Sequence, residues 1–178
     1  MRHQILHDLG ACVEAVRWAE QYDTLQAAWD ACDNGSRMLW YAGACSGPAG
    51  DPRRKPLVLC CVECARLAWP YVRDRDRAVV QRCYETSESW ARDQGATLED
   101  VRVAADAAAD AAYDATSAAW AAVDAAYAAA YAASDAVAYA ASAAAGAAAY
   151  AASAAERARM LRECADVVRR HYPVCPAQ

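Results

Sequence analysis

The chain has 178 residues and a formal net charge of −5, with 18 basic and 23 acidic side chains. Fifty residues are Ala, whereas Leu, Ile, Val and Phe together number only 24. No run of 18 large apolar residues is present, so no membrane-spanning helix is expected. The slightly acidic balance argues against a dedicated nucleic-acid binder. An odd number of Cys, nine, and a start of mixed polarity favour a reduced cytoplasmic protein over a secreted disulfide scaffold.

The first 40 residues predict short helices separated by turns. Apolar residues at helical spacing predict a helix from Ile5 to Ala19, and Gly10 is expected to move the actual start of this helix later. Thr24 is expected to cap a helix that runs through Trp29. The next helix is expected to follow the turn at 32–36, with Ser36 as its cap.

The middle of the chain predicts a loop followed by two longer helices. Two Gly and three Pro mark 46–56 as a loop. Residues 57–69 are apolar on almost every side, which predicts a buried central helix that ends near Pro70. An amphipathic helix is expected over 77–91. Thr97 and Asp100 then resemble a capping box at the start of the Ala-rich part.

The second half of the chain is dominated by alanine. Residues 104–155 contain 33 Ala, five Asp and one Gly, with no Pro, Lys or Arg. Because Ala is the strongest helix former, this composition predicts helix. One unbroken helix of almost 50 residues would be about 75 Å long. A hairpin that breaks near Ser134 or Gly146 is the alternative. A closing amphipathic helix is expected over 156–171, stopped by Pro173.

On a helical projection, the Ala-rich segment has two unlike faces. Its Asp and Ser residues gather in one sector flanked by aromatic residues, and the opposite half is Ala with two Val. The smooth Ala face is expected either to pack within the chain or to pair with a second copy as a homodimer.

The aromatic and acidic face is the main candidate binding surface. Tyr and Trp are enriched at the centres of protein interfaces, although the same residues also serve as core where Ala cannot fill space. Both interpretations stay open from the residues alone. The candidate partner-binding residues are Tyr113, Trp120, Asp124, Tyr127, Tyr131 and Asp135.

Neither a metal centre nor a catalytic site is predicted, and no cofactor is expected. Cys60, Cys61 and Cys64 contain a C-x-x-C, but it lies in the apolar central helix, where Cys acts as a small hydrophobe. Zinc would need a second pair of ligands. Only three His are present, without a nucleophile elbow, a phosphate-binding loop or a dinucleotide fingerprint.

Basic clusters provide an alternative, ligand-binding site. Arg53, Arg54 and Lys55 could hold a phosphate group, with Tyr or Trp stacking on a base. A second cluster over 73–77 alternates Arg with Asp, which predicts ion pairing at the surface.

Several stretches, taken in order, resemble one family of bacterial and phage proteins. They are LGAC at 9–12, TLQAAW at 24–29, CARLAWPYV at 64–72, ATLEDVR at 96–102 and CADVVRRHYP at 164–173. The family is similar to the fifth immunity-protein type of toxin–immunity systems. This resemblance implies an all-helical protein that binds and neutralises something.

Together these features predict one all-α domain over 1–178, with a short-helix half (1–100) and an Ala-rich half (101–172). The expected function is non-catalytic inhibition of an unidentified partner protein in toxin–immunity or phage–host conflict. Two alternatives remain: a small-ligand sponge that sequesters a signalling nucleotide, and a structural helix-packing module.

Overall fold

The computed structural model describes residues 4–48, 50–113 and 154–176, together with nine residues between 125 and 150. This described part contains helices and turns but no β-strand, which confirms the predicted all-α fold. Its elements are α1 (Gln4–Asp8), α2 (Val13–Ala19), α3 (Leu25–Ala31), α4 (Gly35–Ala44), α5 (Arg54–Arg66), η1 (Trp69–Tyr71), η2 (Asp74–Asp76), α6 (Arg77–Ala91), α7 (Leu98–Tyr113) and α10 (Ala154–His171).

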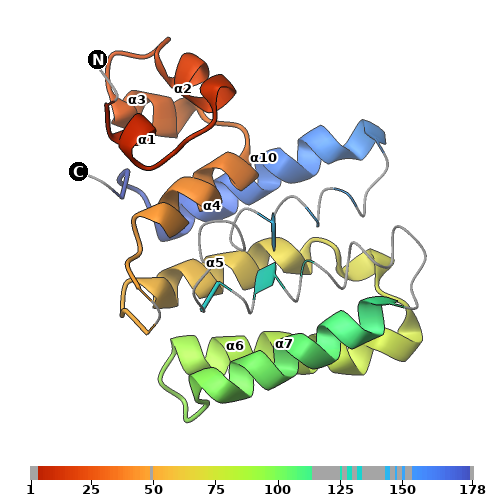
Figure 1. Cartoon of the computed structure of the whole chain (residues 1–178). Helices are drawn as coiled ribbons and strands as arrows, with labels where there is room; N and C mark the ends of the chain where they lie inside the picture. Colours follow the sequence, from red (N-terminus) through yellow and green to blue (C-terminus); the bar gives the residue numbers. More distant parts are fainter. Residues whose placement is uncertain are drawn as a thin grey trace.

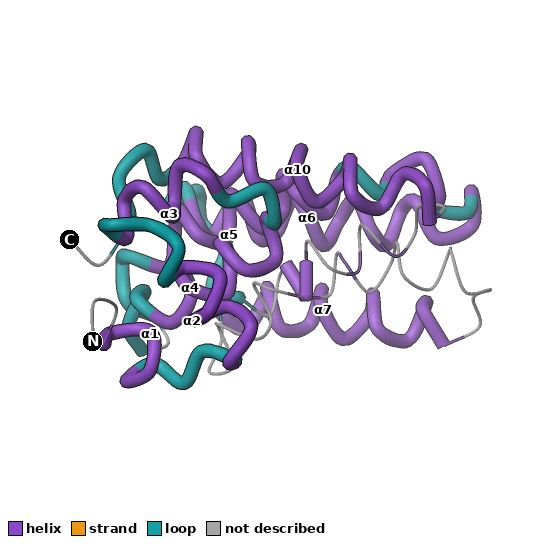
Figure 2. The backbone as a smooth tube through the Cα atoms, turned by 90° about the horizontal axis from the view of Figure 1, so that it is seen from above, coloured by secondary structure: helices purple, strands orange, loops and turns teal. Residues whose placement is uncertain are grey.

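The longer helices lie in three layers (Figure 1). α4 and α10 pack side by side, α5 packs against both of them, and α6 with α7 forms the layer beyond α5. The short helices α1, α2 and α3 form a group at one end, close to both chain termini (Figure 2). α5 is therefore the central helix, as its all-round apolar sequence predicts.

The N-terminal stretch forms two helices rather than the one predicted from Ile5 to Ala19, and the later start expected from Gly10 is confirmed for the second of them. α1 ends at Asp8, and Gly10 has a φ of +77°, in the left-handed region that favours glycine. α2 begins only at Val13. The break falls at the glycine that delays the predicted start.

Two short side chains begin the next two helices. The Thr24 hydroxyl accepts a hydrogen bond from the Ala27 N–H at 3.0 Å, which confirms the predicted cap of α3. At α4 the cap is Asn34 rather than Ser36, because the Asn34 side chain accepts from the Arg37 N–H at 3.2 Å. Ser36 lies inside the first turn of the helix.

α5 runs from Arg54 to Arg66, three residues earlier at each end than expected. The turn η1 then contains Pro70, which cannot continue an α-helix. Seven apolar residues of α5 are buried: Leu57, Val58, Cys60, Cys61, Val62, Cys64 and Ala65.

α6 and α7 pack against each other along their lengths. α6 has the predicted bounds, and α7 opens on the predicted capping box: Thr97 Oγ1 accepts from the Asp100 N–H at 3.2 Å, and Asp100 accepts from the Thr97 N–H at 2.8 Å. On α7, Ala105 and Ala108 are buried, whereas Asp106 and Asp110 are exposed. The predicted division into an alanine face and an acidic face is thus confirmed for this helix.

α10 packs very close to α4. A Cβ atom added at Gly35 would lie 2.3 Å from the Cys164 Cβ and 2.7 Å from the Ala165 backbone nitrogen. Only glycine fits between the two backbones at this point. α10 ends at His171, two residues before Pro173, as predicted.

Most of the described alanines between 125 and 150 are covered within the chain. Seven of them are at most 8% exposed: Ala125, Ala128, Ala129, Ala132, Ala133, Ala144 and Ala147. Ala132 and Ala133 form a turn, beside one of the two predicted break points at Ser134. This turn excludes one unbroken helix and agrees with the hairpin alternative.

One hydrophobic cluster joins the two halves of the chain. It includes Leu6 of α1, Met38 of α4, Val80 of α6, Val101 of α7 and Val168 of α10. Among the described residues, no helix combines the length and the apolar character needed to cross a bilayer.

Candidate protein-binding cleft

Most of the predicted aromatic and acidic face lies outside the described residues. Tyr113 is the last residue of α7. The other five predicted residues, Trp120, Asp124, Tyr127, Tyr131 and Asp135, fall in the undescribed parts of the Ala-rich segment. This surface therefore stays a prediction.

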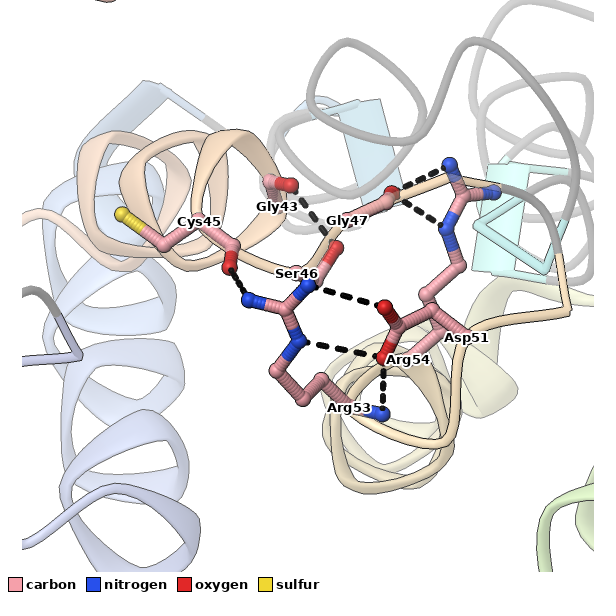
Figure 3. Close-up of polar contacts among 7 residues, drawn as sticks. All are labelled: Gly43, Cys45, Ser46, Gly47, Asp51, Arg53 and Arg54. Carbon is pink, nitrogen blue, oxygen red and sulfur yellow. Dashed lines mark hydrogen bonds and ion pairs between the residues drawn. The ribbon is translucent and has the colours of Figure 1, made fainter.

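The three predicted ligand-binding cations have three different surroundings. Arg53 is exposed and forms an ion pair with Asp51 at 2.8 Å (Figure 3). Hydrogen bonds from the Arg53 side chain and backbone lower the pKa of Asp51 to about 2. Lys55 pairs instead with Asp93, in the turn after α6.

Arg54 is buried, with 2% exposure, and binds backbone carbonyls. Its Nε and Nη2 donate to the Gly47 oxygen at 2.9 and 2.7 Å, and its Nη1 donates to the Ala133 oxygen at 3.3 Å (Figure 3 shows the Gly47 pair). Arg54 thus joins the loop before α5 to the turn at 132–133. The structure does not gather the three cations on one surface that faces a ligand.

The second basic cluster pairs with its own carboxylates, as predicted, but one of these carboxylates is buried and not at the surface as expected. Asp76 is buried and accepts from Arg73 Nε at 2.6 Å, and Arg75 lies 3.7 Å from the same carboxyl group. Arg77 pairs with Asp74 at 3.1 Å. These ion pairs stabilise the connection between α5 and α6.

The C-x-x-C of α5 lies in the core, as its apolar helix predicts. Cys60, Cys61 and Cys64 have no exposed surface. The Cys64 thiol lies 3.9 Å from the Cys164 carbonyl oxygen, across the contact between α5 and α10. Among the described His, Cys, Asp and Glu residues, no group of three or more is placed to hold a metal ion.

A polar contact ties the end of α10 to α5. The Glu63 carboxylate binds Arg170, and its Oε2 lies 2.9 Å from the His171 Nε2. Partial burial would raise the pKa of Glu63, but the hydrogen bonds from His171 and Arg170 outweigh it and leave the pKa lowered.

A cleft at the N-terminal end of the molecule is the strongest candidate site. It lies among α1 to α4 and has a volume of about 70 Å³. Apart from Arg37, its lining is almost entirely apolar and aromatic. The lining residues are Leu6, Ala11, Ala15, Trp18, Ala19, Leu25, Ala28, Trp29, Cys32, Arg37, Met38, Trp40, Tyr41 and Cys175.

Three tryptophans and a tyrosine give the cleft its aromatic walls. Trp29 is 5% exposed, and its ring lies 6.1 Å from that of Tyr41. Trp18 and Trp40 are half-buried. Half-buried Trp presents a large rigid surface that loses little conformational entropy when a partner covers it.

The C-terminal tail completes the cleft. The Trp29 indole N–H donates to the Tyr172 carbonyl at 3.0 Å, and the Cys175 N–H donates to the Gln26 side chain at 2.8 Å. These bonds hold Cys175 against α3 and α4. Burial raises the pKa of Tyr41, whose hydroxyl faces the thiols of Cys175 and Cys45.

Arg37 is the one charged residue in the lining. It is exposed on the first turn of α4, and among the residues that the structure describes its guanidinium meets no carboxylate. Arg37 and Asp33 both lie close enough to Cys32 to act electrostatically on its thiol. Arg37 is therefore available to donate hydrogen bonds to a bound group.

Sequence reasoning missed this cleft, although its residues are individually noticeable. Trp18, Trp29 and Trp40 are three of the six Trp in the chain. Each lies in a predicted short helix, and no pattern in the sequence shows that these helices converge. The spacing of 11 residues between successive members of this trio is the only available signal.

Comparison with known proteins gives no assignment. No family model, no curated protein and no solved structure matches the chain. The resemblance to an immunity-protein family therefore stands on the quoted stretches alone.

Proposed function

We propose that the protein is a non-catalytic binding protein that inhibits a partner protein, and that the partner docks at the N-terminal cleft. The aromatic lining of the cleft carries this proposal. Trp, Tyr and Arg are the residue types most enriched among those that dominate binding energy at protein interfaces. Here Trp18, Trp40, Tyr41 and Arg37 meet in one small apolar site.

The volume of the cleft favours a protein partner over a nucleotide. Small-molecule sites are usually about 300–1,000 Å³, whereas this cleft measures about 70 Å³. A space of this size holds one inserted side chain, with the rest of the partner lying on the surrounding surface. The nucleotide alternative also loses the buried Arg54 as a phosphate ligand.

The biological setting is proposed from the family resemblance. An inhibitor of this kind would serve in toxin–immunity or phage–host conflict, inside the cytoplasm. The aromatic and acidic face from Tyr113 to Asp135 would extend the same binding function to the Ala-rich half.

Filling the cleft tests the proposal directly. Ala15→Leu adds three carbon atoms to the lining, and Ala109→Leu makes the same change on the half-exposed surface of α7. Host proteins are captured on the full chain and on both variants, and each captured protein is then purified and titrated. We expect a stoichiometric partner whose affinity falls at least tenfold for Ala15→Leu and is unchanged for Ala109→Leu.

Two other results would contradict this assignment. A partner that binds Ala15→Leu as tightly as the parent places the binding surface elsewhere. A large thermal shift with one nucleotide, and none with any protein, favours the nucleotide sponge, because a specific ligand stabilises the fold by mass action.

A further inference from the structure

The surface around the cleft carries a strong negative charge. Residues 4–41, which include α1 to α4 almost entirely, contain six carboxylates and two arginines, a net charge of −4. All six carboxylates are exposed: Asp8, Glu14, Glu20, Asp23, Asp30 and Asp33. Outside this group of helices and the Ala-rich segment 104–155, the chain has 16 basic and 12 acidic residues, so the negative charge is local.

Three of these carboxylates are not held in ion pairs with described residues. Elsewhere, acidic residues such as Asp51, Glu63 and Asp76 form ion pairs with nearby Arg side chains. Within the described part of the chain, Glu14, Glu20 and Asp33 form no such pair. The net charge of −4 over residues 4–41 therefore acts on whatever approaches the cleft.

Three described arginines lie on or against this group of helices and do not reverse the balance. One of them, Arg169 of α10, donates to the Cys32 carbonyl and is paired with Asp166 at 2.9 Å. Arg17 is exposed on α2, between Glu14 and Glu20 in sequence, and Arg37 shares the neighbourhood of Cys32 with Asp33. Each arginine is thus accompanied by at least one carboxylate. Arg37 supplies a directional hydrogen-bond donor, and the net charge of the surrounding helices remains negative.

The size of the cleft defines the apolar part of the ligand. An engineered protein cavity of about 150 Å³ holds benzene, and the cleft, at about 70 Å³, is smaller. It therefore fits one aliphatic side chain better than an aromatic ring. The walls of Trp18, Trp29 and Trp40 would cover that side chain on several sides.

We infer that the cleft binds a basic segment of a partner protein, which inserts one aliphatic side chain between the tryptophans while flanking Lys or Arg residues face the carboxylates of α1 to α4. This inference rests on the proposed function and specifies the chemistry of the partner. Opposite charges steer the encounter and exclude acidic partners, and the apolar contact retains the complex.

Peptide selection against the whole protein tests the inference while the partner is still unidentified. Random displayed peptides are selected on the full chain, and those that lose binding to Ala15→Leu are retained as cleft-dependent. Ala11→Leu, at another lining position, serves as a second filling variant, and circular dichroism checks that both variants fold. Binding of the retained peptides is measured by Trp fluorescence.

We expect the retained peptides to share one aliphatic residue flanked by Lys or Arg. Their affinity should fall about three- to tenfold in the double variant Glu14→Gln, Asp33→Asn, and again when the salt concentration is raised. The matched control, Glu85→Gln with Glu99→Gln, removes two exposed carboxylates from α6 and α7 and should leave the affinity unchanged.

The unfavourable outcomes separate the two proposals. Cleft-dependent peptides that are neutral or acidic overturn the basic partner and leave the cleft as a binding site. If neither Ala15→Leu nor Ala11→Leu weakens the binding of any selected peptide, the cleft is not the binding site. The proposed function is then overturned as well.

Discussion

At the scale of single residues, glycine and arginine decide contacts that no other residue could make. Gly35 permits a close approach between α4 and α10, because its missing Cβ leaves room for the backbone of α10. From a buried position, Arg54 donates to the backbone carbonyls of Gly47 and Ala133. Gly35 therefore determines how closely α4 and α10 pack, and Arg54 holds the loop before α5 against the turn at 132–133.

Gly35→Ala is expected to destabilise the fold by about 1–3 kcal/mol, because the added methyl group overlaps the Cys164 Cβ and the backbone beside it. Urea denaturation measures the change. Arg37→Ala, two residues later on the exposed side of α4, is the control and should have little effect. Equal stability of Gly35→Ala and the parent would show that α4 and α10 are not packed this closely.

Arg54→Met is expected to cost about 1–3 kcal/mol, because the Gly47 and Ala133 carbonyls lose their charged donor while remaining enclosed. Arg53→Met, the neighbouring substitution at an exposed ion pair, should change stability little. Thermal unfolding of the two variants gives the comparison. A larger loss of stability for Arg53→Met than for Arg54→Met would show that Arg53 is the arginine that stabilises the fold.

At the scale of helices, a helix boundary can be predicted where a side chain close in sequence caps the end of the helix. The capping box at Thr97 and the Thr24 cap can be predicted because a side-chain oxygen and its backbone partner lie three residues apart in sequence. The start of α5 cannot be predicted in this way. Arg54 opens that helix with no side-chain cap, and the tertiary contacts of its own guanidinium hold it in place.

The Ala-rich segment shows why helical phase does not prove helical continuity. Its acidic and aromatic sectors keep one phase across the turn at Ala132 and Ala133. The projection depends only on residue spacing in the sequence, so a turn between two helices leaves it unchanged. The N-terminal cleft could not be predicted either. The angles between its short helices depend on packing, and the periodicity of the sequence carries no information about those angles.

The contact between α5 and the last turn of α10 is expected to depend on pH. The pKa of Glu63 is lowered from its ordinary 4.5, so its contribution to stability is present above that value and is lost as the pH falls through the folded-state pKa. Stability curves of the parent and Glu63→Gln should therefore converge as the pH falls below the ordinary value of 4.5. The difference at neutral pH should be under about 1 kcal/mol, because the pair is partly exposed.

Glu85→Gln, on the exposed face of α6, provides the comparison for this titration. Its difference from the parent measures the effect of removing an exposed carboxylate without the Glu63 contact. A constant difference between the parent and Glu63→Gln across the acid range would mean that the carboxylate does not anchor α10.

At the scale of the whole molecule, the nine thiols report on how tightly the layers close. Cys12 is exposed, Cys45 is half-buried and the other seven are buried. Burial also raises the pKa of the Cys83 thiol to about 12, which suppresses the reactive thiolate. A thiol reagent should therefore modify Cys12 rapidly and Cys45 slowly, with the remaining seven reacting only on unfolding.

Cys12→Ser should remove the rapid phase of this labelling and leave the slow phases unchanged. Mass spectrometry of the native protein counts the modified sites at each time. Rapid modification of Cys60 or Cys64 would show that α5 is not enclosed by its neighbours.

The homodimer expected from a smooth Ala face stays a prediction. Its premise is an uncovered apolar strip, whereas seven of the described alanines between 125 and 150 are covered within one chain. Light scattering measures the outcome: a mass of two chains supports a paired Ala face, and a mass of one chain contradicts it.

The tail that closes the cleft also affects when the cleft can form during synthesis. Trp29 and Gln26 receive their partners from residues 143 and 149 positions later in the chain. During synthesis, α1 to α4 leave the ribosome long before Tyr172 and Cys175 exist, so the nascent chain presents an incomplete cleft. If the cleft is the binding site proposed above, it therefore becomes competent to bind only after Cys175 has been synthesised.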